Sequence, residues 1–308
     1  TNVNNLDMLS SDQLRAMTTN QIVKLDMGAI STDNLAALTT QQIAALTTQQ
    51  IVDLDTNIAA LTTSQARALK TTQLTKLTGT QIASMENEDL AALTTAQIKA
   101  LTATQLANLT DTTDGQISAL TTSQIAAMTT TQINSLTTDQ LAALTTSQMK
   151  GLTNAQLAKL TSTKLNSLEA VDFQALSATQ IKALTTAQIQ GLSASTNNLV
   201  AALSTSQVFA MTSAQITKLA IADLNTSSLS SLSATQIKAL TTNQIQSITP
   251  AKIPALTASQ IASLTTSQIR ALTTAPNQLG ALTSTQIAAL SPVQVAAMTT
   301  DQIASLNF

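Results

Sequence analysis

Residues 120–144 read LTTSQIAAMTTTQINSLTTDQLAAL, three copies of one eight-residue unit. Each unit begins with Leu or Met, continues with Thr and carries Gln at its fifth position, so an octad is numbered here from its apolar first residue. Ser or Thr followed three residues later by Gln is a capping box, in which both side chains satisfy amide groups at a helix start. Leu120 and Ile125 stand where a hydrophobic staple packs across that start. The octad therefore predicts a new helix every eight residues.

Helices that start this close together are limited to about six residues, because the next cap residue must leave the helical conformation. In one long helix the leucines would drift by about 80° per octad and form no stripe. Ala, Leu and Gln are poor strand formers, and strict alternation is missing. Such short helices are unstable alone and must stack on one another. We therefore predict an all-α solenoid of about six-residue helices built from an L-T-T-x-Q-I-A-A repeat, with a β-solenoid as the alternative.

The positions within the octad predict which side chains are buried. Ile125 and Met128 are three residues apart and share one helix face, which we expect to be buried. Positions 7 and 8 are mostly Ala, with Lys or Arg in some copies, and are expected to point outward. The methionines stand mostly at first positions and are interpreted as core residues in place of Leu.

The repeat runs along all 308 residues and predicts a single continuous solenoid over 1–308. Of the 35 intervals between successive apolar first residues, 29 are eight residues long, and 25 of those carry Gln at position 5. Where Gln is missing, the substitutes include Asp89, Asp172, Asp223, Lys164 and Lys252. Pro250 and Pro292 directly follow a cap residue, where proline is favoured.

Six intervals break the period. The interval that begins at Leu54 is one residue short, and the others are longer than eight. Insertions in a solenoid map to surface loops, and Asp, Asn, Gly and Pro in several of these segments favour loops. We predict loop insertions near 26–37, 110–119, 193–202, 220–231 and 273–281.

Two segments resemble each other on a longer scale. Residues 4–30 and 197–224 both begin with Asn-Asn-Leu and both end at a five-residue insertion. We interpret this as a duplication in which a geometric feature recurs along the solenoid.

The octad phase also suggests how copies could join. If a second copy followed head to tail, its Leu6 would lie eight residues beyond Leu306. The register could therefore continue across a junction between subunits.

Composition excludes several classes of function. The chain has no Cys and no His, which removes disulfides, the usual zinc sites and Ser-His or Cys-His catalysis. Only 10% of residues are charged and the net charge is −2, which argues against nucleic-acid binding. The sequence contains no run of 18 apolar residues that would predict a membrane-spanning helix, and no signal peptide is visible. We predict that the chain is not an enzyme and has no catalytic, cofactor or metal site.

The polar clusters have ordinary interpretations. Acidic residues gather at Glu86, Glu88 and Asp89, and at Asp111 and Asp114. They lack the ligand spacing of a calcium loop, and Asp114-Gly115 is interpreted as a solvated turn. Asn108-Leu-Thr110 and Asn225-Thr-Ser227 match glycosylation sequons, which are expected by chance in a chain this rich in Ser and Thr.

The L-T-T-x-Q-I-A-A repeat resembles stretches of long, repeat-rich secreted or surface structural and adhesin-type proteins of bacteria. The resemblance implies a structural, adhesive or matrix-forming role at the cell surface or outside the cell, as in a biofilm matrix. We predict a structural protein that self-assembles head to tail into an extracellular filament or sheath. Its expected partners are copies of itself, with cell-surface or matrix components as further candidates. The alternatives are a rigid stalk or spacer of a large surface adhesin, and an ice-binding or S-layer-like surface protein.

Overall fold

A computed structural model describes residues 6–112, 115–192 and 197–307. Contacts divide the chain into two compact units, Thr1–Lys159 (unit 1) and Leu160–Phe308 (unit 2). Within the described ranges there is no β-strand, and the β-type pairing there is an isolated antiparallel bridge between Thr274 and Asn277. The predicted all-α solenoid of short helices is confirmed, and the β-solenoid alternative is not the observed fold. That 1–308 forms one continuous solenoid stays a prediction.

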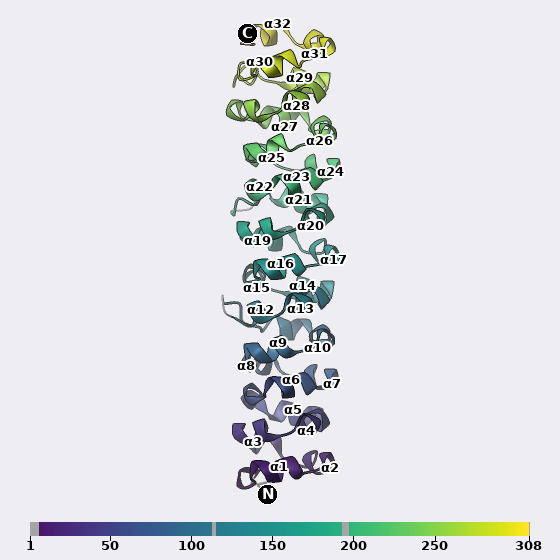
Figure 1. Cartoon of the computed structure of the whole chain (residues 1–308), viewed down its shortest axis with the longest axis vertical. Coiled ribbons are helices and arrows are strands. Elements are labelled where there is room, and N and C mark those ends of the chain that lie inside the picture. The colour runs from purple at the N-terminus through teal and green to yellow at the C-terminus, as the bar shows by residue number, and fades with distance from the viewer. Residues whose placement is uncertain (1–5, 113–114, 193–196, 308) are drawn as a thin grey trace. The chain divides into compact units, whose positions relative to one another are not determined.

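Short helices follow one another along each unit (Figure 1). Unit 1 contains η1 (Leu6–Met8), α1 (Ser11–Ala16), α2 (Thr19–Ile22), η2 (Met27–Ala29), α3 (Thr32–Ala37), α4 (Thr40–Ala45), α5 (Thr48–Asp53), η3 (Asp55–Ala60), α6 (Thr63–Ala68), α7 (Thr71–Leu74), α8 (Gly79–Ser84), α9 (Asn87–Ala92), α10 (Thr95–Ala100), α11 (Ala103–Leu106), α12 (Gln116–Ala119), α13 (Thr122–Ala127), α14 (Thr130–Ser135), α15 (Thr138–Ala142), α16 (Thr146–Gly151) and α17 (Asn154–Leu157). Unit 2 contains α18 (Ser162–Asn166), α19 (Ala170–Ala175), α20 (Ala178–Ala183), α21 (Thr186–Leu192), α22 (Leu199–Ala202), α23 (Thr205–Ala210), α24 (Ser213–Ile216), η4 (Ile221–Asp223), α25 (Thr226–Ser230), α26 (Ala234–Ala239), α27 (Thr242–Ser247), η5 (Pro250–Ala255), α28 (Ala258–Ser263), α29 (Thr266–Ala271), α30 (Ser284–Ala288), α31 (Pro292–Ala297) and α32 (Thr300–Ala304).

Most of the described helices begin at the predicted capping box, but α9 and α19, whose cap residues are Glu86 and Glu169, lack it. At α13 the Thr121 hydroxyl accepts from the Gln124 N–H at 3.2 Å, and the Gln124 side-chain oxygen accepts from the Thr121 N–H at 2.7 Å. The helix ends at Met128, whose backbone is extended and which starts the next octad. One residue therefore ends a helix and stands next to the cap of the following one, which is why six residues is the usual helix length.

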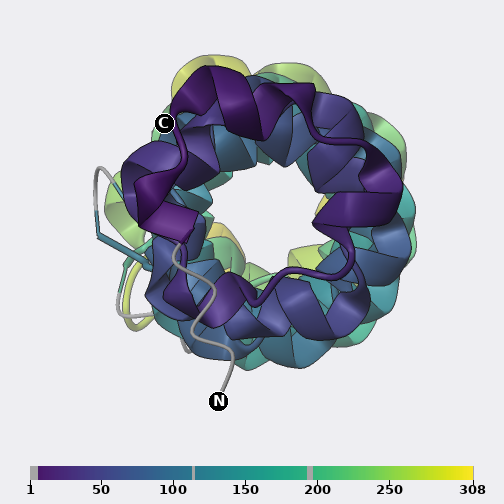
Figure 2. The ribbon, with the colours of Figure 1, turned by 90° about the horizontal axis from the view of Figure 1, so that it is seen from below.

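The core is built from octad positions 1 and 6. Ile125 has none of its surface exposed and Met128 only 3%, and the same two positions are buried in nearly every octad. Successive helices wind around a common axis, as Figure 2 shows for the purple and blue helices of unit 1. Each helix packs on a helix about one turn of the solenoid away, for example α10 on α13 in unit 1 and α20 on α23 in unit 2.

Two of the insertions are not the surface loops that we predicted. In the segment 26–37, the added residues form η2 with a buried Met27, and a complete octad then begins at the buried Ile30. In the segment 220–231, η4 buries Ile221, and an octad begins at the buried Leu224. The added residues are partly apolar, so the chain buries them as short 3-10 helices. These two helices occupy corresponding places in the two similar segments 4–30 and 197–224.

Two other insertions separate a cap residue from its glutamine. Thr110 and Gln116 keep both bonds of the capping box, whereas Thr273 and Gln278 keep only one, because the Thr273 hydroxyl donates to the Pro276 carbonyl. Thr110 still accepts from the Gln116 N–H at 2.9 Å, and the Thr273 N–H still donates to Gln278 at 2.9 Å. Residues 113–114 and 193–196 lie outside the described residues, so the predicted loops there are only partly described. The short interval after Leu54 is a 3-10 helix, η3.

The cap hydroxyl predicts a measurable contribution to stability. Replacing Thr121 with alanine is expected to lower the free energy of unfolding by about 1 kcal/mol, because the Gln124 N–H loses its acceptor. Thr122→Ala, at the adjacent exposed first residue of α13, provides the matched control. Urea unfolding followed by circular dichroism would measure both variants. Equal effects of the two substitutions would contradict this assignment of the cap.

Candidate functional site

The fifth residue of the octad links one turn of the solenoid to the next. Gln148 is 2% exposed, and its side-chain oxygen accepts from the Thr145 N–H at 2.8 Å. Its Nε2 group donates to the Ile117 and Leu120 carbonyls at 2.8 and 2.6 Å. Those carbonyls stand at the end of α12 and would otherwise lack a full set of partners. One amide therefore caps its own helix and the end of a helix in the preceding turn.

The same pair of interactions recurs along both units, and we call it the glutamine ladder. In unit 1 its members are Gln42, Gln50, Gln65, Gln73, Gln81, Gln97, Gln105, Gln116, Gln124, Gln132, Gln140, Gln148 and Gln156. In unit 2 its members with both ends described are Gln188, Gln207, Gln215, Gln236, Gln244, Gln260, Gln268, Gln278, Gln286, Gln294 and Gln302. The Gln148–Leu120 link spans 28 residues, which is the approximate length of one turn there.

The ladder is the feature that reasoning from sequence missed. The capping box accounts for the acceptor oxygen of the glutamine but leaves its NH₂ group without a role. Glu serves equally well in a capping box, yet it never appears at position 5 of an eight-residue octad in this chain. The use of an amide in 25 of the 29 eight-residue octads was the available signal, because glutamine, unlike glutamate, can both accept and donate at neutral pH.

Other side chains replace glutamine where the turn geometry changes. Asn34 donates to the Leu6 carbonyl at 3.0 Å, and Asn57 donates to the Ile30 carbonyl at 2.9 Å. Ser228 donates to the Leu203 carbonyl at 2.6 Å. Asn34 and Ser228 belong to the octads that follow η2 and η4. Ser228, and not the predicted Asp223, therefore holds the ladder position in that segment.

Asp89 breaks the ladder in unit 1. It is 1% exposed, and its Oδ2 atom has no hydrogen-bond partner. Burial raises the pKa of Asp89 to about 6, and the nearby charges of Glu86 and Glu88 contribute to the rise. The spacing of Gln81 and Gln97 places the Ile58 and Leu61 carbonyls opposite position 89. A carboxylate cannot donate to a carbonyl, so the ionised Asp89 side chain cannot make the ladder bonds that glutamine makes at this position.

Asp172 and Lys164 show the same effect of burial in unit 2. Asp172 is buried, and desolvation, with a smaller contribution from Glu169, raises its pKa. Burial lowers the pKa of Lys164. In both cases an ionisable group occupies a position where an uncharged amide is the rule.

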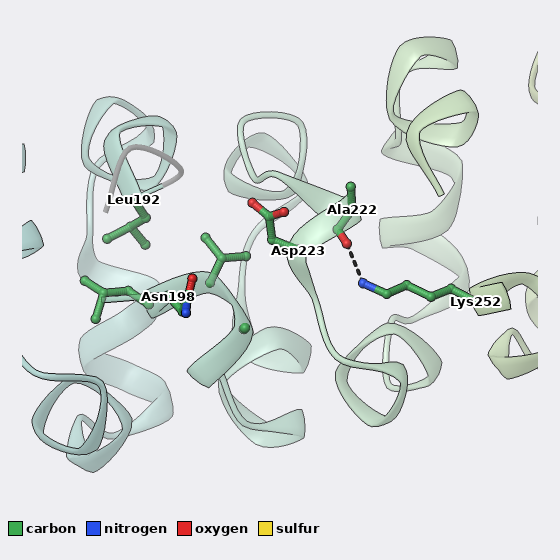
Figure 3. A pocket seen from close by; sticks show the side chains of 8 residues that line it. Leu192, Asn198, Ala222, Asp223 and Lys252 are labelled. Carbon is green, nitrogen blue, oxygen red and sulfur yellow. Dashed lines mark hydrogen bonds between the residues drawn. The ribbon is translucent and has the colours of Figure 1, made fainter. Parts of the chain in front are cut away.

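Lys252 takes the place of glutamine beside η4, next to a pocket of about 290 Å³ (Figure 3). Its ammonium group donates to the Ala222 carbonyl and, at 2.8 Å, to the Leu224 carbonyl. The pocket is lined by Leu192, Asn198, Leu199, Val200, Ala201, Ala222, Asp223 and Lys252. Asp223 is exposed, and Lys252 serves to bridge two turns.

The last described turn, residues 282–307, exposes positions that are buried elsewhere. Val295 and Ile303 stand at position 6 and are each 41% exposed, and Ile287 at the same position is half-buried. Two sets of carbonyls of this turn receive no bond from a described side chain: those of Ile287, Val295 and Ile303 at position 6, which accept only a backbone N–H, and those of Leu290, Met298 and Leu306 at the following position 1. We call these groups together the last-turn surface.

The remaining predictions about sites can be compared with the structure only in part. No three acidic residues among those described lie close enough to hold a metal ion. Asn225 accepts from the Ser228 N–H at 2.8 Å as a helix cap, and Asn108 donates to the Thr104 carbonyl at 2.8 Å. Asp114 lies outside the described residues. In the described part of the chain, no helix is both long and apolar enough to cross a membrane. The absence of catalytic and cofactor sites stays a prediction.

The repeated capped helix and the glutamine ladder define an α-helical repeat protein. The ALTTAQ repeat family matches residues 24–56, 82–114, 113–146, 165–196 and 276–307, together more than half of the chain. The chain therefore belongs to the ALTTAQ repeat family. A comparison with curated proteins found no match.

Proposed function

We propose that this chain is a structural protein that assembles head to tail with copies of itself into a filament. The observation that carries the proposal is the last-turn surface, with the exposed Val295 and Ile303 side chains and the open carbonyls around them. An extracellular place of action, in a sheath or matrix at a bacterial surface, is part of the proposal and rests on the resemblance of the repeat.

The exposed apolar side chains favour a protein partner. Position 6 is fully buried in the interior turns because the following turn covers it. Burial of a valine or isoleucine side chain contributes about 1.5–3 kcal/mol when it is complete. Covering Val295 and Ile303 would therefore supply part of the free energy of association.

The identity of the repeat favours a second copy as that partner. The surface that covers position 6 inside each unit is itself a turn of the same repeat, and it also brings the amides that the carbonyls need. A contact between two different surfaces of identical subunits does not close on itself and continues as an open assembly. With a net charge of −2, little repulsion opposes such association.

Charging the last-turn surface tests the proposal. The 308-residue chain is expected to form filaments visible by negative-stain electron microscopy and to grow in mass with concentration in light scattering. The double variant Val295→Lys, Ile303→Lys is expected to weaken association about tenfold or more, because two lysine charges would have to be buried. Val171→Lys, which changes a valine that is already 58% exposed on α19, is the control and should assemble normally.

Single particles of the unchanged chain at all concentrations would overturn self-assembly. The same result would favour the alternative role as a rigid spacer in a larger surface protein. Filaments that form equally well with Val295→Lys, Ile303→Lys would show that a different surface is used.

A further inference from the structure

The first described turn, residues 6–30, carries the counterpart of the last-turn surface. Gln13 and Gln21 both complete a capping box, since their oxygens accept from the Ser10 and Thr18 N–H groups at 2.8 Å. Both side chains are exposed, and neither makes a ladder bond to another described residue. Their Nε2 groups are therefore unused donors that the capping box already holds in position.

The arrangement of these donors matches that of the open carbonyls. Gln13 and Gln21 are eight residues apart, in consecutive octads. Inside unit 1, the consecutive glutamines Gln148 and Gln156 bond to the ends of two consecutive helices. The last-turn surface presents such carbonyls at Ile287, Val295 and Ile303, near the ends of α30, α31 and α32, also eight residues apart. The two donors of the first turn and the open carbonyls of the last-turn surface therefore have the same spacing along the chain.

We propose that Gln13 and Gln21 of one copy donate to the open carbonyls of the last-turn surface of the next copy, so that the ladder continues across the junction. This inference rests on the proposed function and specifies its partner surface and its polarity. Every junction pairs a first turn with a last turn, and two identical surfaces never pair.

An isosteric substitution tests the donor role of Gln13 and Gln21 separately from their capping role. In the double variant Gln13→Glu, Gln21→Glu, the carboxylates can still accept from the cap N–H groups, so the first turn is expected to fold. They cannot donate at neutral pH and would face carbonyl oxygens instead. We expect this variant to remain monomeric at concentrations where the unchanged chain assembles. Gln41→Glu, an exposed residue at position 4 of its octad, adds charge without touching the ladder and serves as the control.

Mixing two blocked variants tests the polarity directly. One is Gln13→Glu, Gln21→Glu, which keeps an intact last-turn surface. The other is Val295→Lys, Ile303→Lys, which keeps an intact first turn. Each alone is expected to be monomeric, and their equimolar mixture is expected to give heterodimers that grow no further, measured by light scattering after size exclusion.

The outcomes distinguish this inference from the proposed function. If the unchanged chain never associates, the proposed function fails. If the unchanged chain assembles and Gln13→Glu, Gln21→Glu assembles equally well, only the assignment of the donors fails. Filaments from the mixture, or no heterodimer in it while the unchanged chain assembles, would overturn the polarity. Circular dichroism and thermal unfolding of each variant would verify that it is folded.

Discussion

Replacing Gln148 with alanine is expected to lower the free energy of unfolding of unit 1 by about 3 kcal/mol. The substitution removes a buried amide that accepts from the Thr145 N–H and donates to the Ile117 and Leu120 carbonyls. A net hydrogen bond contributes about 1 kcal/mol, and buried groups left without a partner cost about 1–3 kcal/mol each. Urea unfolding of the full chain, followed by circular dichroism, would measure the loss.

Gln21→Ala, measured at a concentration at which the chain is monomeric, provides the matched control. Gln21 has the same capping box but makes no ladder bond to another described residue, and its side chain is exposed. Its loss is expected to cost about 0.5–1 kcal/mol, the value of the capping interaction alone. A cost as small for Gln148→Ala as for Gln21→Ala would mean that the ladder contributes nothing beyond capping.

Replacing Asp89 with glutamine is expected to stabilise unit 1 by about 2 kcal/mol or more at pH 7. The raised pKa of Asp89, about 6 against an ordinary value of 3.8, means that ionising this carboxyl opposes folding. Glutamine removes the buried charge and restores a donor toward the Ile58 and Leu61 carbonyls. The gain would appear as a higher urea midpoint of unfolding.

The pH dependence of that gain follows from the direction of the shift. Between about pH 4 and pH 6 the folded chain holds a proton on Asp89 that the unfolded chain has already released. The stability of the unchanged chain therefore falls as the pH rises through this range, and the benefit of Asp89→Gln grows over the same range. Asp139→Gln, at an exposed position of α15, is the control and should give no such trend. A benefit that stays constant from pH 4 to pH 7 would contradict the assignment to Asp89.

Local rules explain why the sequence predicted the helices so well. Each helix is specified within eight residues by its own cap, staple and box, as at Thr121 and Gln124, and no distant contact is needed to predict it. The insertions were harder to interpret, because Met27 and Ile221 become core residues only when another turn covers them. Whether an added segment loops out or is buried depends on that neighbouring turn.

The inter-turn role of Gln148 could not be placed from the octad, because its acceptor lies 28 residues away in the chain. The octad fixes the direction of the side chain but not the number of octads per turn, which decides the acceptor. The sequence shows that the glutamine NH₂ group has no partner in its own capping box, but it does not show which carbonyl accepts from it. For the same reason, the burial of the Asp89 carboxyl was not predicted from the sequence.

The long reach of the ladder has a consequence for how such a chain folds. Gln148 can make its bonds only after the residues back to Ile117 have been ordered, so a fragment much shorter than one turn forms no ladder bond at all. Ordering the first turn costs chain entropy before any ladder bond can form to offset it, as in the nucleation of a helix. Each later octad then packs on a turn that is already folded, so its ladder bonds form as soon as it docks. We therefore expect slow initiation and rapid growth, with an existing turn acting as the seed.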